Sequence, residues 1–488
     1  MFRKIAAAAA ALLLLFSLAA CGISYTPSSY VQVYETTGTK SYLLSRRSDL
    51  DWEASALTGN ATVTVDLSEE GQTLGGFGAT MTHSSAYLLM QADEQTRSRI
   101  LSDLFSADGA NLNYVRIPIG ATDYIPESEF FTCDDTENNA EDLSLAQFNI
   151  SHDANIIAVL KEALAVNPDL RFIAVPWSAP AWMKTNYSLI GGSLDEKYND
   201  VYAEYLLKFL QAYAAEGIEI DLVCILNEPY IQGVAYPSMN MDGLQAAGII
   251  SLLGQKIEKA GLSAQIIAYD HNYSSGSSIT AELYIDAVLG DKNSAKYVTG
   301  ISFHGYGNDG FEDFKGGLEY VQNEYKKDVY ITEITEYSAS IDFASNISYS
   351  LQNVVINPLN YGLKAATYWN FVLTSDGTPV KGNSSECYGI INLDREGDSW
   401  HYSKNASYYA MAHVSKFVYE VNGKEAVRLG TESSNTNVIA TSFYRGDGAL
   451  VVIAHNVSDL SYERVDFVVG DKMFTYDIQP QSVVTFVC

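Results

Sequence analysis

The chain has 488 residues, of which 59 are acidic and 30 are basic, so its formal net charge is -29. A surface this negative repels nucleic acid and anionic membranes, and we expect neither as a direct partner. Apolar residues make up 47% of the sequence. That share is typical of a globular protein, and the length favours one large domain with a smaller one beside it.

Residues 1–20 have the pattern of a secretory signal peptide. Arg3 and Lys4 precede an apolar stretch over residues 5–18, and small residues follow directly before Cys21. The stretch is too short for a comfortable membrane span. The cysteine after small residues resembles the lipobox of bacterial lipoproteins, which implies that Cys21 is lipidated. An ordinary signal cut nearby is the alternative. We therefore expect an extracytoplasmic, cell-surface or membrane-anchored lipoprotein whose lipid-attached tether covers residues 21–28.

Four further cysteines are scattered along the chain, at positions 133, 224, 387 and 488. They include no C-x-x-C pair, so the pattern indicates neither a zinc site nor a disulfide framework. A bridge between Cys133 and Cys387 stays open. We expect no metal and no cofactor.

The apolar pattern changes twice along the chain. Residues 29–72 contain stretches of period two, which predict strands. Residues 406–488 again favour strands joined by tight turns, and the two ends together are predicted to form a side β-sandwich. Between them, over residues 73–405, short apolar runs alternate with helical patterns. The eight strands predicted there are 76–81, 113–117, 172–175, 222–226, 265–268, 300–303, 329–332 and 365–369.

Eight such alternations favour the α/β class, with a (β/α)8 TIM barrel over residues 73–405. An open doubly wound sheet is the alternative. No glycine-rich nucleotide motif follows any of the predicted strands, which removes the usual reason to prefer that sheet.

Polar and aromatic side chains recur where the predicted barrel strands end. In barrels of this kind the active site forms at the C-terminal ends of the strands. A lone glutamate there is more often a salt-bridge partner than a catalyst, so the recurrence carries the argument. The residues are Arg116, Asp123, Trp177, Asn227, Glu228, His304, Tyr306, Glu333 and Trp369.

Two of these residues are carboxylic acids on nearly opposite strands, Glu228 after the fourth and Glu333 after the seventh. Cleavage of a glycosidic bond requires two carboxyl groups, one to protonate the leaving oxygen and one to attack or stabilise the anomeric carbon. A separation of about 5–5.5 Å allows a covalent intermediate and retention of configuration, whereas a wider gap implies inversion.

Seven stretches in chain order carry a resemblance to a known family. They are Gly-Gly-Phe-Gly-Ala-Thr at 75–80, Tyr-Val-Arg-Ile-Pro-Ile-Gly at 114–120, Trp-Ser-Ala-Pro-Ala-Trp-Met-Lys-Thr-Asn at 177–186, Asn-Glu-Pro at 227–229, Phe-His-Gly-Tyr at 303–306, Ile-Thr-Glu at 331–333 and Tyr-Trp-Asn at 368–370. In these stretches the chain resembles glycoside hydrolase family 30, which includes glucosylceramidases and endo-β-1,6-glucanases. The resemblance implies a β/α barrel with a side β-sandwich made from both termini.

The resemblance also implies roles for the acidic pair. Glu228 corresponds to the general acid/base and Glu333 to the nucleophile of a retaining β-glycoside hydrolase. Arg116 would help to keep Glu333 ionised, because a nearby cation favours the charged carboxylate. Glu228 would need a raised pKa to hold a proton near neutrality. Glu336 follows Glu333 closely and is the alternative nucleophile, although only Glu333 ends the apolar run.

Six further positions match groups of the family that contact the substrate or the nucleophile. Asn227 corresponds to the amide that binds the sugar 2-hydroxyl. The others line the subsite for the non-reducing sugar or lie beside the nucleophile; the full set is Asp123, Trp177, Asn227, His304, Tyr306 and Trp369.

The expected substrate is a β-linked carbohydrate, with β-1,6-glucan or another β-glucoside such as glucosylceramide preferred. The sequence shows no basic rim, which argues against an acidic polysaccharide. β-1,6-Galactanase, xylanase and fucosidase activities of the same family stay open. The alternative from another class is a surface carbohydrate-binding lipoprotein without turnover.

Overall fold

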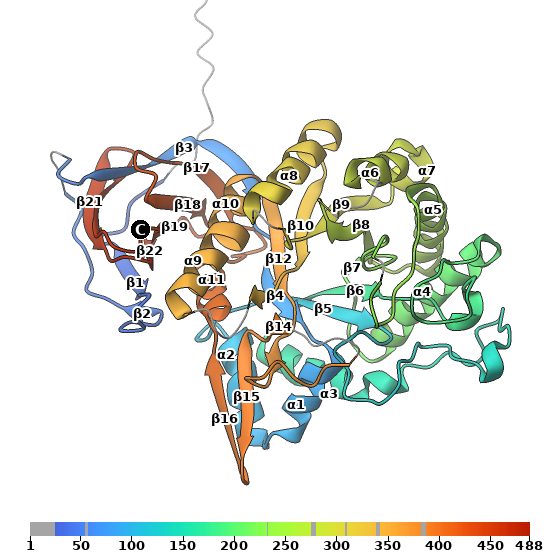
Figure 1. Cartoon of the computed structure of the whole chain (residues 1–488). Helices are drawn as coiled ribbons and strands as arrows, with labels where there is room; N and C mark the ends of the chain where they lie inside the picture. The colour runs from blue at the N-terminus through green and yellow to red at the C-terminus, as the bar shows by residue number, and fades with distance from the viewer. Residues whose placement is uncertain are drawn as a thin grey trace, which may run out of the picture.

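The computed structural model describes residues 25–53, 57–231, 233–274, 280–307, 310–337, 342–381 and 387–488. It places a closed eight-stranded barrel beside a nine-stranded sheet, on the right and left of Figure 1 respectively. The predicted signal peptide and Cys21 lie outside the described residues. None of the helices in the described ranges combines the length and the apolar character needed to cross a membrane.

The barrel confirms the predicted α/β class and has a strand at each of the eight predicted places, although β7 covers only Leu222–Val223 of the predicted 222–226. Its hydrogen-bonded order is β10-β12-β4-β5-β6-β7-β8-β9, with every pair parallel. These strands read as apolar runs because both of their faces are buried. They are β4 (Gly76–Thr80), β5 (Tyr114–Ile119), β6 (Arg171–Pro176), β7 (Leu222–Val223), β8 (Gln265–Asn272), β9 (Val298–His304), β10 (Asp328–Glu333) and β12 (Leu363–Tyr368).

The longer helices on the outside of the barrel turn an apolar stripe toward it, and α4 (Asn199–Ala215) is the clearest case. In α4, Tyr202, Leu206 and Phe209 are fully buried, as their spacing predicts. The helices are α1 (His83–Gln91), α2 (Glu94–Phe105), α3 (Ala154–Val166), α4 (Asn199–Ala215), α5 (Gly243–Ala260), α6 (Ala281–Gly290), α7 (Lys292–Ala295), α8 (Phe311–Tyr325), α9 (Phe343–Ser350), α10 (Asn357–Asn360) and α11 (Ala406–Ser415). Short 3-10 turns cover Glu137–Asn139, Ser151–Asp153, Ala181–Met183 and Glu196–Tyr198, and a π-helical turn covers Leu351–Ile356.

The nine-stranded sheet contains strands from both ends of the chain, as predicted. Its order is β2-β1-β22-β19-β18-β17-β3-β20-β21. Phe467 and Phe486 come from strands far apart in this order, yet their ring centroids are 4.6 Å apart, so the sheet curls over into a sandwich. The strands are β1 (Gln32–Thr36), β2 (Ser45–Arg46), β3 (Ala61–Thr73), β17 (Val427–Ser433), β18 (Val438–Tyr444), β19 (Leu450–Asn456), β20 (Glu463–Val469), β21 (Lys472–Ile478) and β22 (Ser482–Val487).

Outside the barrel strands, the structure departs from the sequence predictions in two details, a helix and two small sheets. Helix α11 opens the segment predicted to be a sandwich of strands. Two small sheets lie outside the barrel, and one of them is the projecting hairpin at the bottom of Figure 1; their strands are β11 (Glu336–Tyr337), β14 (Cys387–Tyr388), β13 (Val372–Leu373), β15 (Ile391–Glu396) and β16 (Ser399–Lys404). None of the four described cysteines forms a disulfide. The domain limits at residues 72 and 405 stay predictions.

Two buried histidines join the barrel side to the sheet. His413 on α11 shares hydrogen bonds of 2.8 Å with Thr485 and Thr36, on strands β22 and β1. His455 on β19 shares one of 2.9 Å with Ser348 on α9. Burial lowers the pKa of His413 to about 3 and that of His455 to about 4; His455 adds to the shift of His413. Both imidazoles are therefore neutral at neutral pH.

Acid is expected to destabilise the protein through these two histidines. An unfolded histidine titrates near pH 6.5, so between about pH 6.5 and about pH 4 the unfolded chain binds more protons. Stability is then lost as the pH falls, by about 1.4 kcal/mol per pH unit for each histidine. Urea unfolding across this window measures the slope. A His413→Asn variant should show a shallower slope than the wild type, and an exposed control, His401→Gln on β16, should not. Equal slopes for all three proteins would contradict the assignment.

Candidate active site

Arg116 lies at the centre of a charged cluster at the C-terminal ends of the barrel strands. The side chain leaves β5 and is fully buried. Its guanidinium donates to Oε2 of Glu333 at 2.6 Å, to Oδ1 of Asn227 at 2.7 Å and to Oδ2 of Asp270 at 2.8 Å. One cation therefore holds in place groups from three other strand ends.

Glu333 ends β10 and contacts two further predicted site residues. Oε1 accepts a hydrogen bond from the Tyr306 hydroxyl at 3.1 Å and lies 3.9 Å from Nδ1 of His304. Burial raises the pKa of Glu333, and the charges of His304 and Arg116 act against that rise without cancelling it. Arg116 thus acts in the predicted direction, but burial outweighs it in the substrate-free site.

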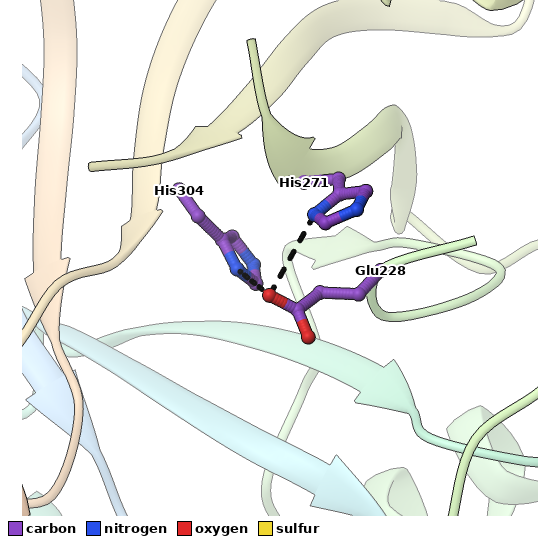
Figure 2. A group of neighbouring side chains, drawn as sticks. All are labelled: Glu228, His271 and His304. Atoms are coloured by element: carbon purple, nitrogen blue, oxygen red, sulfur yellow. Dashed lines mark hydrogen bonds and ion pairs between the residues drawn. The ribbon is translucent and has the colours of Figure 1, made fainter. Parts of the chain in front are cut away.

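Glu228 follows β7 and faces two imidazoles, as Figure 2 shows. Oε1 lies 3.1 Å from Nδ1 of His304 and 3.6 Å from Nδ1 of His271. Burial alone would raise the pKa of Glu228, but the hydrogen bonds and charges of the two histidines outweigh it and lower the pKa. The pKa shift is thus opposite to the rise predicted from the sequence for an acid catalyst. His271 is not among the predicted site residues.

His304 ends β9 and links the two glutamates. Burial would lower its pKa, but the carboxylates around it, Glu333 first, then Asp270 and Glu228, raise the pKa to about 10. The imidazole is therefore protonated at neutral pH in the substrate-free site. The proton on Nδ1 lies in the hydrogen bond to Glu228. Glu228 is the group that would donate a proton to a leaving group.

Asp270 is a buried member of the cluster that sequence reasoning missed. Besides Arg116, it accepts a hydrogen bond of 2.5 Å from Thr332 and lies 3.7 Å from Nε2 of His304. Burial would raise the pKa of Asp270, but Arg116 and His304 lower it, so the carboxylate is ionised. The predicted strand stops at residue 268, whereas β8 continues to Asn272. The signal was available, because Asp270 and His271 follow an apolar run like the other site residues.

A β-bulge allows Asp270 and His271 to point toward the same centre. Consecutive strand residues normally face opposite sides, but the register of β8 against β9 shifts between Tyr269 and His271. Tyr269 and Asp270 have φ angles of 85° and 58°, in a region that non-glycine residues rarely adopt. The turned backbone also lets the Asp270 carbonyl accept the Glu228 N–H at 2.9 Å. The bulge thus brings the Asp270 carboxylate, the Asp270 carbonyl oxygen and the His271 imidazole to the same cluster.

Aromatic rings form one wall beside the charged cluster. Trp177 and Trp369 are each 3% exposed, and their ring centroids are 5.2 Å apart. Tyr124 meets Trp369 edge-on at 5.6 Å, and the Arg116 guanidinium lies 4.7 Å from the Trp177 ring centroid. The two predicted tryptophans therefore lie next to Arg116, as the strand-end argument expects.

Asp123 and Tyr236 lie in loops close enough to the two glutamates for their charges to act on both residues. Burial and then the charge of Glu333 raise the pKa of Asp123 well above its ordinary value, which favours the neutral acid. Tyr236 packs against the aromatic cluster that includes Trp369. Burial and then the Glu228 charge raise its pKa. Sequence reasoning missed Tyr236, since a tyrosine in a long loop carries no strand-end signal.

Replacement of Tyr306 by phenylalanine is expected to lower kcat/KM by about 10- to 100-fold, because a hydrogen bond to a charged group contributes about 1.5–3 kcal/mol. The hydroxyl donates to Glu333 and is lost without change of shape. The matched control is Tyr402→Phe, which removes a hydroxyl that donates to Asp103 on the outside of the barrel. Steady-state kinetics on a chromogenic substrate compare the two. An equal effect of both changes would contradict a role for the Tyr306 hydroxyl.

Two family models cover most of the chain. The glycosyl hydrolase family 30 TIM-barrel domain matches residues 74–418, and the family 30 β-sandwich domain matches residues 425–486. The chain belongs to glycosyl hydrolase family 30. It is therefore a glycosidase, which favours the enzyme over the binding-only alternative.

Curated relatives and solved structures agree with the family. The chain is 29% identical to an endo-1,6-β-D-glucanase of Neurospora crassa over 416 residues, 81% of each chain. It is 26% identical to the lysosomal acid glucosylceramidase of Mus musculus over 467 residues, 90% of this chain and 87% of the relative. The structure of the endo-β1,6-glucanase BT3312 superposes with a TM-score of 0.82 at 28% identity, covering 94% of this chain and 99% of that one. Family 30 membership thus identifies a β-glycoside hydrolase whose substrate is a β-linked carbohydrate.

Proposed function

We propose that the protein is a retaining β-glycosidase in which Glu228 is the acid/base and Glu333 the nucleophile. One observation carries this: Nδ1 of His304 lies 3.1 Å from Oε1 of Glu228 and 3.9 Å from Oε1 of Glu333, so these oxygens are at most about 7 Å apart. Inverting enzymes need carboxyl groups about 6.5–9.5 Å apart, to admit a water, and retaining enzymes about 5–5.5 Å. The limit of about 7 Å admits the retaining separation and excludes all but the narrow end of the inverting range, which favours retention.

In the first step Glu333 attacks the anomeric carbon while Glu228 protonates the leaving oxygen. Arg116 and Tyr306 hold the two oxygens of Glu333, which fixes the direction of the attacking lone pair. Asn227 accepts from Arg116 through Oδ1. Its NH2 group is therefore the part of the amide that can donate to the sugar 2-hydroxyl.

The leaving-group proton comes from the pair of Glu228 and His304. Their hydrogen bond carries one proton between Nδ1 and Oε1. A bound sugar expels water, which removes solvation from the ionised pair and favours its neutral form. The proton then moves to Glu228 for donation. Once Glu333 is esterified, the largest charge that raises the pKa of His304 is gone. In the second step Glu228 takes a proton from the water that attacks the anomeric carbon, and Glu333 leaves as a carboxylate.

The proposed substrate is β-1,6-glucan or another β-glucoside such as glucosylceramide. The relatives carry those activities in their names: an endo-1,6-β-D-glucanase and a glucosylceramidase. The net charge of -29 disfavours an acidic polysaccharide such as glucuronoxylan. Trp177 and Trp369 form a buried aromatic wall beside Arg116, against which a hexose can pack, and Asp123 offers a carboxyl group to its hydroxyls.

A hydrolysis screen with β-1,6-glucan, glucosylceramide, β-1,6-galactan and neutral xylan tests the substrate. We expect turnover of a β-glucoside to exceed that of galactan and xylan, and turnover of galactan or xylan alone would contradict the proposal. Proton NMR of the first-formed sugar tests the stereochemistry. The β-anomer is expected from a β-substrate, and the α-anomer would exclude retention.

We also propose that the enzyme is an extracytoplasmic lipoprotein anchored through Cys21. The support is the sequence before that residue, with two basic residues, an apolar stretch and small side chains. A Cys21→Ser variant should lose the incorporation of labelled fatty acid and pass from the membrane fraction to the soluble one. Incorporation at the wild-type level would contradict the anchor.

A further inference from the structure

Glu228, His271 and His304 form a cluster whose ligand-type atoms converge, as Figure 2 shows. They come from the ends of three successive barrel strands, β7, β8 and β9. One carboxylate oxygen and one nitrogen from each imidazole all lie within 4.8 Å of one another. All three side chains are buried, with exposures of 7%, 2% and 1%.

The separations fit a small transition-metal ion. Zinc bonds to imidazole nitrogen and carboxylate oxygen at about 2.0–2.2 Å, so two ligand atoms of a tetrahedral site lie about 3.4 Å apart. Oε1 of Glu228 is 3.1 Å from Nδ1 of His304 and 3.6 Å from Nδ1 of His271, on either side of that value. Two histidines and one glutamate are also a ligand set that protein zinc sites use with a water in the fourth position.

His271 supplies an independent observation. Its buried Nδ1 has only the long contact of 3.6 Å with Oε1 of Glu228, beyond ordinary hydrogen-bond distance, although buried polar atoms are nearly always paired. The bulge in β8 turns this nitrogen toward Glu228. His271 has no role in the proposed hydrolysis. A bound ligand would account for the direction in which its Nδ1 points.

The surrounding charge favours a dication. Asp270 and Glu333 lie next to the cluster, and Arg116 is the cation that both contact. Binding of the ion releases the proton of His304 to solvent. With both imidazoles then neutral and Arg116 charged, the carboxylates of Glu228, Asp270 and Glu333 leave the centre negative by two charges. A divalent ion compensates that excess in a site that excludes most water.

We propose that Glu228, His271 and His304 bind Zn²⁺ and that the bound ion inhibits hydrolysis. The ion takes the Oε1 atom through which Glu228 would hold its proton, so it acts as an inhibitor and has no part in turnover. The inhibition rests on the proposed role of Glu228, whereas the binding rests only on the cluster. Nitrogen ligands favour Cu²⁺ in the same place and disfavour Mg²⁺ and Ca²⁺, which prefer oxygen.

Calorimetric titration of the whole enzyme with ZnCl₂, in the absence of substrate, tests the binding. We expect one ion per chain and at least 10-fold weaker binding by His271→Gln, which removes one ligand. The matched control, His401→Gln, changes an exposed histidine on β16 and should bind like the wild type. Equal affinity of wild type and His271→Gln, or no binding by the wild type, overturns the site.

Inhibition is measured separately with ZnCl₂, CuCl₂ and MgCl₂ on an aryl β-glucoside. Zn²⁺ and Cu²⁺ should inhibit, EDTA should restore activity and Mg²⁺ should have no effect. If His271→Gln weakens binding but the bound ion does not inhibit the wild type, the proposed role of Glu228 is overturned and the zinc site stands. If His271→Gln does not fold, the visible spectrum of the Co²⁺-loaded wild type decides: intense bands of a four-coordinate ion support the site, and weak octahedral bands overturn it.

Discussion

Replacement of Glu333 by glycine is expected to lower kcat by about 10⁴-fold or more, because in the proposed mechanism Glu333 forms the glycosyl-enzyme. Added azide should restore turnover and give a glycosyl azide of α configuration from a β-substrate, since azide then attacks from the side that the carboxylate occupied. The measurement is the rate on a dinitrophenyl β-glucoside, with NMR of the azide product.

Glu228→Ala and Glu336→Gln are the matched comparisons for that result. Loss of the acid/base should slow natural substrates by about 10²–10⁴-fold, and less for dinitrophenyl leaving groups, which need no proton. Azide should here give the β-glycosyl azide. Glu336, three residues after Glu333 on β11, should be replaceable with little effect. Collapse of Glu336→Gln beside an active Glu333→Gly would move the nucleophile to Glu336.

Replacement of Arg116 by methionine is expected to destabilise the fold by about 3–5 kcal/mol, because it leaves buried carboxylates without their cation. Asp270 and Glu333 both pair with this guanidinium, and Arg116 is fully buried. Activity should fall with the stability, since Glu333 and Asn227 lose a common anchor. The free energy of unfolding from urea titration measures the first effect.

Arg171→Met is the matched control on the neighbouring strand β6. Arg171 pairs with Glu425 at 3.0 Å, but its side chain is 30% exposed. Exposed pairs contribute only about 0–1 kcal/mol, so this variant should stay close to the wild type in stability and activity. Equal destabilisation by both changes would contradict the burial argument.

The barrel was predictable because its strands are buried on both faces and therefore appear as uninterrupted apolar runs. β10 is an example, with Val329 and Ile331 buried before the polar end at Glu333. The rule that polar residues at strand ends face the active site then brought Arg116 and Glu228 together from distant parts of the sequence. That prediction required no knowledge of the contacts between β5 and β7.

For β8 the sequence announces polar residues after an apolar run, but it does not show that two consecutive ones face the site. Asp270 and His271 point to one centre only because the backbone bulges at Tyr269, where φ is 85° without a glycine to announce it. The predicted direction of the Glu228 pKa shift was wrong for the same reason. It depends on two imidazoles from β8 and β9, and their distance from the carboxylate is set by the bulge and the curvature of the barrel.

The pairing of β1 with β22 has a consequence for the order of synthesis. Gln32 lies opposite Val487, so β1, which pairs locally only with the short β2, finds its second partner only when β22 has been made. β3 likewise waits for β17 and β20. Long-range pairs of this kind form slowly, and an unpaired strand can associate with other chains meanwhile. A nascent chain must therefore keep its amino-terminal strands away from other molecules until the whole barrel has emerged, and copies truncated near the carboxyl terminus should aggregate even though every barrel strand is present.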